Sequence, residues 1–447
     1  RYVGDTKPME LRLPIVAIVG RPNVGKSTLF NRIVGKRLSI VHEQEGVTRD
    51  RVAMETDWAG HSFFLVDTGG YIPSSADVID KEVRKQALTA IDEADVIMLM
   101  VDSVVGITWE DEEIVKKAKR SKKPLVLLAN KADNASVENQ AHVFYQLGIG
   151  EVFPVSALNG RSIGDALDKV VSTFGEIQIE ESIDENVIRF AIVGMPNAGK
   201  WSLTNALLGV DRQIVTDIPG TTRDSINTSF NYFGQSYEMI DTAGLRRKAK
   251  VTDSIEYYST IRTQQAIKSA HVVIVLIDAE KGFVSHDARV MEEVLSAGKG
   301  LIVGVNKWDL NKKETNTMRD FKQGLVDDMF ELRHYPIQFI STMERRRIFK
   351  LVDLVKNIHE EQQKRIQTRQ LNLFLEDAVA RLQPASPHGK EIKLNYCSQV
   401  AVEPPVIVIF TNYPDLIKTA YKRYIENRFR EQFGFEGVPI RIAFRKK

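Results

Sequence analysis

The residues from Gly20 to Ser27 have the spacing of a phosphate-binding loop: two glycines separated by four residues, then a lysine and a serine. Glycines let backbone N–H groups turn toward a bound anion, and the helix that follows adds its positive N-terminal dipole. We expect the Lys26 ammonium to contact the β- and γ-phosphates of a nucleotide, and the Ser27 hydroxyl to bind Mg²⁺. The predicted loop consists of Gly20, Arg21, Pro22, Asn23, Val24, Gly25, Lys26 and Ser27.

Three further segments supply the other groups that a GTP site requires. Thr48 offers a second hydroxyl for Mg²⁺, and Asp67 begins a DTGG sequence suited to binding the metal and sensing the γ-phosphate. Asp133 ends an NKAD sequence, where a carboxylate can accept hydrogen bonds from guanine N1–H and the 2-amino group. Adenine lacks that pair of donors, so the motif predicts selection of GTP over ATP. The other predicted contacts are Thr68, Gly69, Gly70 and Tyr71, then Asn130, Lys131 and Ala132, and finally Ser156 and Ala157, which complete the base pocket.

The same motifs occur a second time in the chain. The displacement is 174 residues from Gly20 to Gly194 and 176 from Asn130 to Asn306. A repeat this long indicates a duplicated domain. The second predicted site consists of Gly194, Met195, Pro196, Asn197, Ala198, Gly199, Lys200, Trp201, Thr222, Asp241, Thr242, Ala243, Gly244, Leu245, Asn306, Lys307, Trp308, Asp309, Ser341 and Thr342, with Thr222 and Asp241 as Mg²⁺ ligands.

The second copy differs from the first at a metal ligand, because Trp201 stands where the first copy has Ser27. An indole offers only an N–H donor and cannot coordinate Mg²⁺. Ser202 cannot substitute, since on a helix it points about 100° away. We therefore predict that the second site recognises guanine but holds Mg²⁺·GTP poorly. The alternative is that tryptophan is not the native residue at position 201.

Short apolar runs separated by amphipathic stretches hold these motifs, which predicts α/β domains with a mostly parallel, doubly wound sheet covered by helices on both faces. Beyond residue 358 the pattern becomes that of a small α+β module. Its expected elements are a helix over 371–382, strands over 392–396, 406–411 and 439–444, and a basic helix over 416–433. The predicted organisation is an N-terminal tail 1–12, a GTPase domain 13–175, an acidic linker 176–186, a second GTPase domain 187–357 and a third domain 358–447.

Composition and charge narrow the class of protein. No run of about 18 uncharged apolar residues occurs, which argues against a membrane span. The single cysteine, Cys397, excludes an internal disulfide and favours the reduced cytoplasm. The net charge is +2, but residues 358–447 carry 15 Lys and Arg against 10 Asp and Glu, a balance of +5. This basic end points either to a polyanion partner or to an ordinary solvated surface.

Two GTPase domains followed by a small basic module resemble the Der (EngA) family of bacterial ribosome-assembly GTPases, over residues 9–447. The segments 421–427 (YKRYIEN) and 433–437 (FGFEG) are similar to that family. The resemblance implies a KH-like C-terminal fold, GTP hydrolysis, and binding to the maturing large ribosomal subunit by a monomer.

Many GTPases place a glutamine after the DxxG motif to orient the attacking water, but Tyr71 and Leu245 occupy these positions here and neither can do so. Asn23 and Asn197 match the asparagine with which related GTPases hold K⁺; the alternative is that they only shape the turn. The expected catalytic residues are Lys26, Thr48 and Gly70 in the first copy, and Lys200, Thr222 and Gly244 in the second.

Three functions remain open at this stage. The first is a GTPase whose hydrolysis cycle times attachment to a large-subunit precursor. The second is an RNA-docking protein that senses nucleotide, with incidental turnover. The third, a tRNA-modifying GTPase, is disfavoured because such proteins carry one GTPase domain and a C-terminal cysteine, whereas Cys397 lies within a strand-like segment 50 residues from the end.

Overall fold

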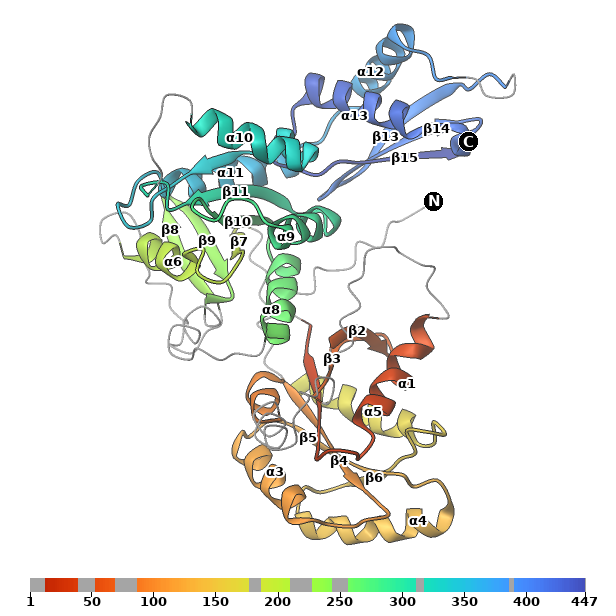
Figure 1. The fold of residues 1–447 in the computed structure, drawn as a ribbon. Helices are drawn as coiled ribbons and strands as arrows, with labels where there is room; N and C mark the ends of the chain where they lie inside the picture. Colours follow the sequence, from red (N-terminus) through yellow and green to blue (C-terminus); the bar gives the residue numbers. More distant parts are fainter. Residues whose placement is uncertain are drawn as a thin grey trace. The chain divides into compact units, whose positions relative to one another are not determined.

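The computed structural model describes residues 13–38, 53–68, 87–176, 186–209, 227–242, 256–310, 317–385 and 390–446. The chain forms two compact units (Figure 1). The first contains the N-terminal α/β domain, and the second contains the second α/β domain together with the C-terminal module. Helix α8 begins in the first unit, to which its residues up to Arg262 belong. Among the described residues, no helix has the length and apolar character needed to cross a membrane.

The first domain is built on a six-stranded sheet with the order β2-β3-β1-β4-β5-β6, in which only the β2–β3 pair is antiparallel. The strands are β1 (Ile15–Val19), β2 (Ala53–Trp58), β3 (His61–Asp67), β4 (Val96–Asp102), β5 (Leu125–Asn130) and β6 (Val152–Pro154). The helices are α1 (Lys26–Leu38), α3 (Trp109–Arg120), α4 (Ala135–Gln140) and α5 (Ile163–Ser172), with 3-10 turns η1 (Ala141–Leu147) and η2 (Thr173–Glu176).

The second domain repeats this topology with the order β12-β11-β10-β7-β9-β8. Its strands are β7 (Ile188–Val193), β8 (Thr228–Tyr232), β9 (Gln235–Ile240), β10 (Val272–Asp278), β11 (Gly300–Asn306) and β12 (Ile337–Phe339). Its helices are α6 (Lys200–Leu208), α8 (Glu256–Ser269), α9 (Ser285–Ser296), α10 (Thr317–Asp328) and α11 (Phe349–Gln362), with the 3-10 turn η3 (Phe330–His334). The prediction of two doubly wound domains is thus confirmed.

The central strands are apolar along their whole length because both faces of each sheet are covered. All seven residues of β4 and all seven of β10 are buried. Alternate residues of a strand enter different clusters, so each sheet separates two layers of core. Burial of this kind is what makes a parallel sheet stable, and it leaves the ends of the strands as the place for polar residues.

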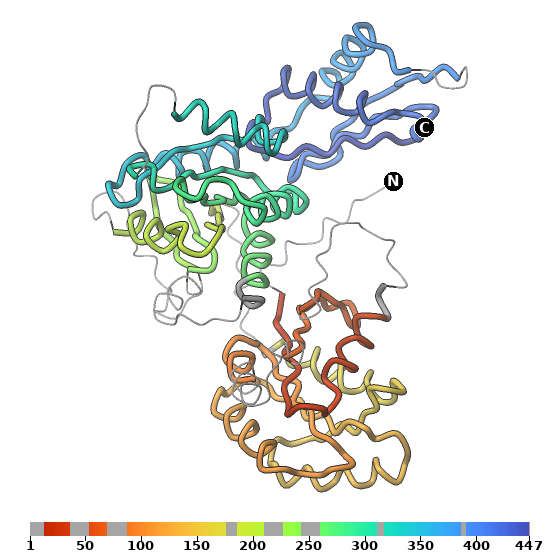
Figure 2. Tube along the Cα trace, in the orientation of Figure 1, coloured from red at the N-terminus to blue at the C-terminus, as the bar shows by residue number. Residues whose placement is uncertain are grey.

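The C-terminal module is a three-stranded sheet, β13-β14-β15, with helices α12 and α13 on one face (Figures 1 and 2). Strand β14 pairs antiparallel with β13 and parallel with β15. Its elements are α12 (Thr368–Arg381), β13 (Leu394–Val402), β14 (Pro405–Thr411), the 3-10 turn η5 (Pro414–Leu416), α13 (Thr419–Phe433) and β15 (Arg441–Lys446).

The C-terminal module and the second GTPase domain share one hydrophobic core. A single cluster contains Leu351 and Ile358 of α11 together with Phe374 of α12 and Phe429 of α13. At the junction, the Gly437 N–H donates to the His334 carbonyl and the Gly437 carbonyl accepts from the Leu301 N–H, both at 2.9 Å. Helix α11 runs through residues 357 and 358, the predicted domain boundary.

Gly437 has a conformational role at this junction. Its φ is +77°, and a Cβ atom there would lie 2.5 Å from Cδ1 of Ile358. A larger residue would therefore both strain the backbone and collide with α11. The close approach of the two domains at this point requires glycine.

Beside this junction lies a buried cluster of basic side chains. The backbone N–H of Arg189 donates to Nδ1 of His271 at 3.1 Å, and the Arg189 guanidinium lies 3.0 Å from Nε2 of the same ring. His271 also stacks on His359, with ring centroids 4.6 Å apart. Burial, reinforced by the charges of Arg189, His359 and Lys299, lowers the pKa of His271 to about 2. His271 is therefore neutral in the folded protein.

Candidate functional site: two guanine-nucleotide sites

The phosphate-binding loop of the first domain connects β1 to α1, as predicted. The strand ends at Val19 and the helix begins at Lys26. The Lys26 ammonium donates to the carbonyls of Gly20 at 2.9 Å and Arg21 at 2.8 Å, so the side chain crosses its own loop. Burial lowers the pKa of Lys26 to about 8, while the nearby Asp67 carboxylate opposes this shift. A bound polyphosphate would replace those carbonyls as the partner of the ammonium.

Asn130 holds the phosphate loop against the base-binding loops. Its side-chain amide donates to the Val24 carbonyl at 2.7 Å, and its oxygen accepts from the Ala157 N–H at 2.8 Å. Gly25 makes this approach possible, because its φ is +100° and a Cβ there would lie 2.3 Å from Nδ2 of Asn130. The first residue of the NKxD motif therefore acts by positioning three loops.

Asp133, the carboxylate predicted to select the base, follows strand β5 by three residues. Asp133 accepts a hydrogen bond from the Ser156 hydroxyl at 2.6 Å. This contact joins the NKxD loop to the Ser156–Ala157 loop, so the structure brings together the two segments predicted to form the guanine pocket. Ala132 is buried with an exposed fraction of 1%, and its backbone N–H donates to the Val155 carbonyl.

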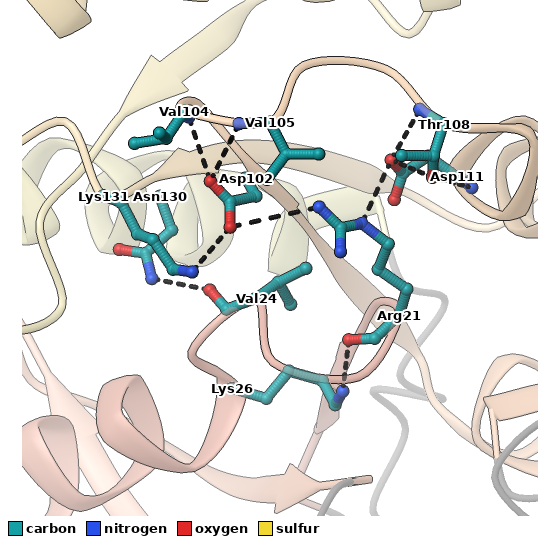
Figure 3. A network of polar contacts seen from close by, with 10 residues as sticks. All are labelled: Arg21, Val24, Lys26, Asp102, Val104, Val105, Thr108, Asp111, Asn130 and Lys131. Carbon is teal, nitrogen blue, oxygen red and sulfur yellow. Dashed lines mark hydrogen bonds and ion pairs between the residues drawn. The ribbon is translucent and has the colours of Figure 1, made fainter.

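Arg21 connects the phosphate loop to the carboxylates at the end of β4 and the start of α3 (Figure 3). Its Nη2 lies 3.9 Å from Oδ2 of Asp102, and its Nε lies 3.5 Å from Oδ2 of Asp111. Asp102 also pairs with Lys131 of the NKxD motif at 2.6 Å. The pairing with Lys131 and backbone N–H groups holds the pKa of Asp102 below its usual value, although burial acts in the opposite direction and is the largest single influence. A continuous charge network thus links the NKxD loop to the phosphate loop.

The predicted Mg²⁺ ligands are only partly within the described residues. Asp67 ends β3 with an exposed fraction of 2%, and the adjacent Thr68 hydroxyl donates to the Ile18 carbonyl at 2.8 Å. Ser27 is exposed on the first turn of α1. A carboxylate and a hydroxyl beside the phosphate loop are oxygen donors of the kind that Mg²⁺ prefers. The other predicted contacts Thr48, Gly69, Gly70, Tyr71, Thr222, Ala243, Gly244 and Leu245 lie outside the described residues.

The second domain repeats the positioning contacts of the first. The Asn306 amide donates to the Ala198 carbonyl at 2.9 Å, and its oxygen accepts from the Thr342 N–H at 3.1 Å. Lys200 donates to the carbonyls of Gly194 and Met195. Lys307 pairs with Asp278 at 2.6 Å, as Lys131 does with Asp102. The remaining predicted residues of this loop set, Pro196, Gly199, Asp241, Thr242, Asp309 and Ser341, lie in the same loops or at the ends of the strands that precede them.

Two substitutions make the second site different. Trp201 lies in the first turn of α6, and Met195 takes the place of Arg21, so within the described part of the chain no guanidinium bridges the phosphate loop to Asp278 and Asp287. Burial raises the pKa of Asp287 above its usual value. Asp309 has one buried carboxylate oxygen with no hydrogen-bond partner in the described residues, which leaves it available to a donor such as guanine N1–H.

Two details modify the predictions for individual residues. Asn23 and Asn197 have φ values of +64° and +68°, the left-handed conformation that the turn-shaping alternative predicts for them. Binding of K⁺ remains a prediction. The indole of Trp308 packs inward against Phe339, with centroids 4.4 Å apart, so only its backbone is left at the nucleotide loop.

Sequence reasoning missed the carboxylates Asp102 and Asp278, which pair with the lysines of the two NKxD motifs. A signal was present, because each aspartate ends the equivalent apolar strand of its copy. Asp111 and the bridging role of Arg21 had no comparable signal, since the contacts join segments about 90 residues apart that only the fold brings together.

Two phosphate loops, each followed by an NKxD loop fixed by its own asparagine, define a tandem P-loop GTPase. The family model described as 50S ribosome-binding GTPase matches residues 15–131 and 189–307, and the model described as KH-domain-like of EngA bacterial GTPase enzymes, C-terminal, matches 365–445. Similar proteins include the GTPase Der of Geobacillus thermodenitrificans (strain NG80-2) and that of Staphylococcus aureus (strain JH9). Each is 46% identical over 434 residues, covering 97% of this chain and 99% of the relative. The chain therefore belongs to the Der (EngA) family of GTPases, and it hydrolyses GTP.

Solved structures with matching segments include Era in complex with MgGDPNP and nucleotides 1506–1542 of 16S ribosomal RNA. It is 22% identical, covers 59% of this chain and 93% of that chain, and has a TM-score of 0.29. A probable GTP-binding protein engB is also 22% identical, covers 36% of this chain and 99% of that chain, and has a TM-score of 0.28.

Proposed function

We propose that this ribosome-associated GTPase is a biogenesis factor of the large ribosomal subunit, and that its nucleotide cycle controls its attachment to the maturing particle. The observation that carries the proposal is the single core shared by the second GTPase domain and the KH-like module. A change of nucleotide in the second domain can therefore act directly on a basic module of the kind that binds RNA. The chain would act as a monomer in the cytoplasm, where such particles mature.

In the first domain, Lys26, Ser27, Thr48 and Asp67 would bind Mg²⁺·GTP. Bound Mg²⁺ would neutralise charge on the β- and γ-phosphates. The ammonium of Lys26 would stabilise the charge that develops as the terminal phosphate is transferred to water. K⁺ held near Asn23 would add a second positive charge. Gly70 would donate its backbone N–H to the γ-phosphate.

In the second domain, Asp309 would read guanine and Asn306 would position the loops around it, but Trp201 offers no oxygen to a metal. We propose that this site binds guanine nucleotide with weak dependence on Mg²⁺, with GDP preferred over GTP, and that Lys200, Thr222 and Gly244 support slower hydrolysis than their counterparts. The alternative function of the chain as a whole is that of a nucleotide-sensing, RNA-docking protein with incidental turnover.

The test of the main proposal is co-sedimentation of the full chain with purified large ribosomal subunits in GTP, GDP and nucleotide-free states at two salt concentrations. We expect the bound fraction to depend on nucleotide and to decrease with salt. Equal binding in all three states would contradict the control of attachment by nucleotide. The Lys26→Ala and Lys200→Ala variants separate the two functions, because the sensor alternative predicts nucleotide-dependent binding and normal cell growth without turnover.

A further inference from the structure

The sheet of the C-terminal module has one covered face and one open face. Helices α12 and α13 cover the face that carries Cys397, Ile407 and Ile409, all with an exposed fraction of 0%. Side chains alternate along a strand, so the residues between these point to the other side. That other face carries Phe410 on β14, which lies outside the shared core cluster. The helices therefore cover only one of the two faces of this sheet.

A row of three side chains crosses the open face. Phe410 lies opposite Tyr396 on β13 and opposite Arg445 on β15. The two aromatic rings have centroids 6.0 Å apart and an interplanar angle of 35°. Tyr396 has an exposed fraction of 42%, and Phe410 is half-buried. Arg445 is exposed and forms no hydrogen bond or ion pair with any residue of the described ranges.

The neighbouring row of this face consists of Ser398, Val408 and Ala443, in which two of the three side chains are small and Val408 is buried. The row of rings is also remote from the GTPase junction, because the guanidinium of Arg441, at the other end of β15, donates to the Ser296 carbonyl at 2.6 Å. Four residues of strand separate Arg441 from Arg445, a distance of about 13 Å.

The charge of this face indicates the chemical class of partner that it can bind. The residues of β13, β14 and β15 that point to the open face include two arginines and no acidic residue. The whole segment 358–447 carries a charge of +5. Adjacent aromatic rings on neighbouring strands stack with unpaired bases, whereas the bases of a duplex are already stacked on one another. A positive side chain at the end of such a row can contact the phosphate backbone.

We propose that the open face of the C-terminal sheet is a binding platform for single-stranded RNA, on which two successive bases stack on Tyr396 and Phe410 while Arg445 contacts a phosphate. This inference rests on the proposed function and assigns its RNA contact to a particular surface. The open face of the sheet, rather than the basic helix α13, makes the stacking contact. The platform reads unpaired bases with little sequence preference, since every base offers a flat apolar face.

The test is fluorescence anisotropy of full-length protein with fluorescein-labelled single-stranded RNA, using eight-nucleotide oligouridine and oligoadenine. We expect Tyr396→Ala to raise the Kd about tenfold or more, and Tyr396→Phe, which keeps the ring, to change it less than twofold. Arg445→Gln is expected to weaken binding and to reduce the slope of log Kd against log salt by about 0.7. Val400→Ala is the matched control, because Val400 is exposed on the same strand but lies outside the row.

Thermal unfolding of each variant shows whether the fold is intact. The proposal is overturned if Tyr396→Ala and Arg445→Gln fold normally and bind both RNAs as the unmodified protein does. It is also overturned if duplex RNA competes as well as single-stranded RNA, or if an acidic peptide with the same net charge as the RNA displaces it. Co-sedimentation with large subunits distinguishes this failure from that of the proposed function. Normal subunit binding by the platform variants refutes the platform alone, whereas no subunit binding by the unmodified chain refutes the function.

Discussion

Replacing Arg21 by methionine, the residue at the equivalent position 195 of the second domain, tests whether the charge network of Figure 3 prepares the phosphate loop for nucleotide. The substitution removes the guanidinium from Asp102 and Asp111 but leaves an apolar side chain of similar length. Asp102 retains Lys131, whereas Asp111 loses the cation that lies 3.5 Å away. We expect the loop to lose its preformed shape and the affinity for nucleotide to fall.

The size of the effect follows from the distances. At an effective dielectric constant of about 20, unit charges separated by the 3.5 Å between Arg21 and Asp111 attract each other by about 5 kcal/mol. Desolvation offsets more than half of this attraction, because the side chains of Asp102 and Asp111 are only 2% and 1% exposed. A net value of ~2 kcal/mol corresponds to about a thirtyfold increase in Kd.

The assay is equilibrium binding of a fluorescent GDP analogue to the full chain in a Lys200→Ala background, so that the first site dominates the signal. A double-mutant cycle with Asp111→Asn isolates the interaction energy between Arg21 and Asp111. Arg21→Lys is the conservative control, and we expect it to lose an intermediate amount of nucleotide affinity because lysine keeps the charge but lacks the planar guanidinium. Removing a nearby positive charge also raises the pKa of Lys26, since Arg21 contributes to lowering it. A Kd within threefold of the parent, with additive single substitutions, would refute the reasoning.

Three further predictions concern a metal ligand and two titrating groups. Trp201→Ser restores a hydroxyl at the second site, and we expect it to raise GTP affinity there at least tenfold in the presence of Mg²⁺ and little in EDTA, measured in a Lys26→Ala background; unchanged affinity contradicts the proposed loss of a metal ligand. The pKa of Lys26 is lowered to about 8, so nucleotide binding by the first site should weaken as the pH rises above 8, and titration of Lys26→Arg, which stays charged, should lack this component. The pKa of His271 is lowered to about 2, so below pH 6.5 the unfolded chain binds a proton that the folded protein does not, and stability should fall by up to about 1.4 kcal/mol per pH unit as the pH decreases. Denaturant unfolding between pH 5 and 8 checks this, and a slope that is unchanged in His271→Leu would show that another group is responsible.

The parts of the site that sequence predicted best are those whose contacts are local. Gly25 and Lys26 are part of one loop between a strand and a helix, so their spacing alone indicates their arrangement. The network of Arg21, Asp102 and Asp111 was not predicted, because its contacts depend on how β1, β4 and the start of α3 are arranged in space. Trp308 shows that a local motif can also mislead. Its place in the NKxD motif indicated a nucleotide contact, but tertiary packing turns its indole into the core.

The fold class was predictable from uninterrupted apolar runs, whereas the limits of the C-terminal elements were not. The strand expected over 392–396 is β13, Leu394–Val402, which contains register irregularities and lies at an edge, so it lacks clear alternation. The helix expected from residue 416 begins at Thr419, because Pro414 to Leu416 form a separate 3-10 turn. Such boundaries depend on backbone contacts with neighbouring segments, which periodicity does not reveal.

The common core of the second GTPase domain and the KH-like module has a consequence for how this chain can be divided. One cluster of buried side chains contains Ile358 of α11 and aromatic residues of α12 and α13, so a fragment ending at Gln362 would lose part of that cluster. The two parts should therefore unfold in a single cooperative transition. The second GTPase domain and the KH-like module lie within one compact unit of the chain, and the first GTPase domain lies in the other.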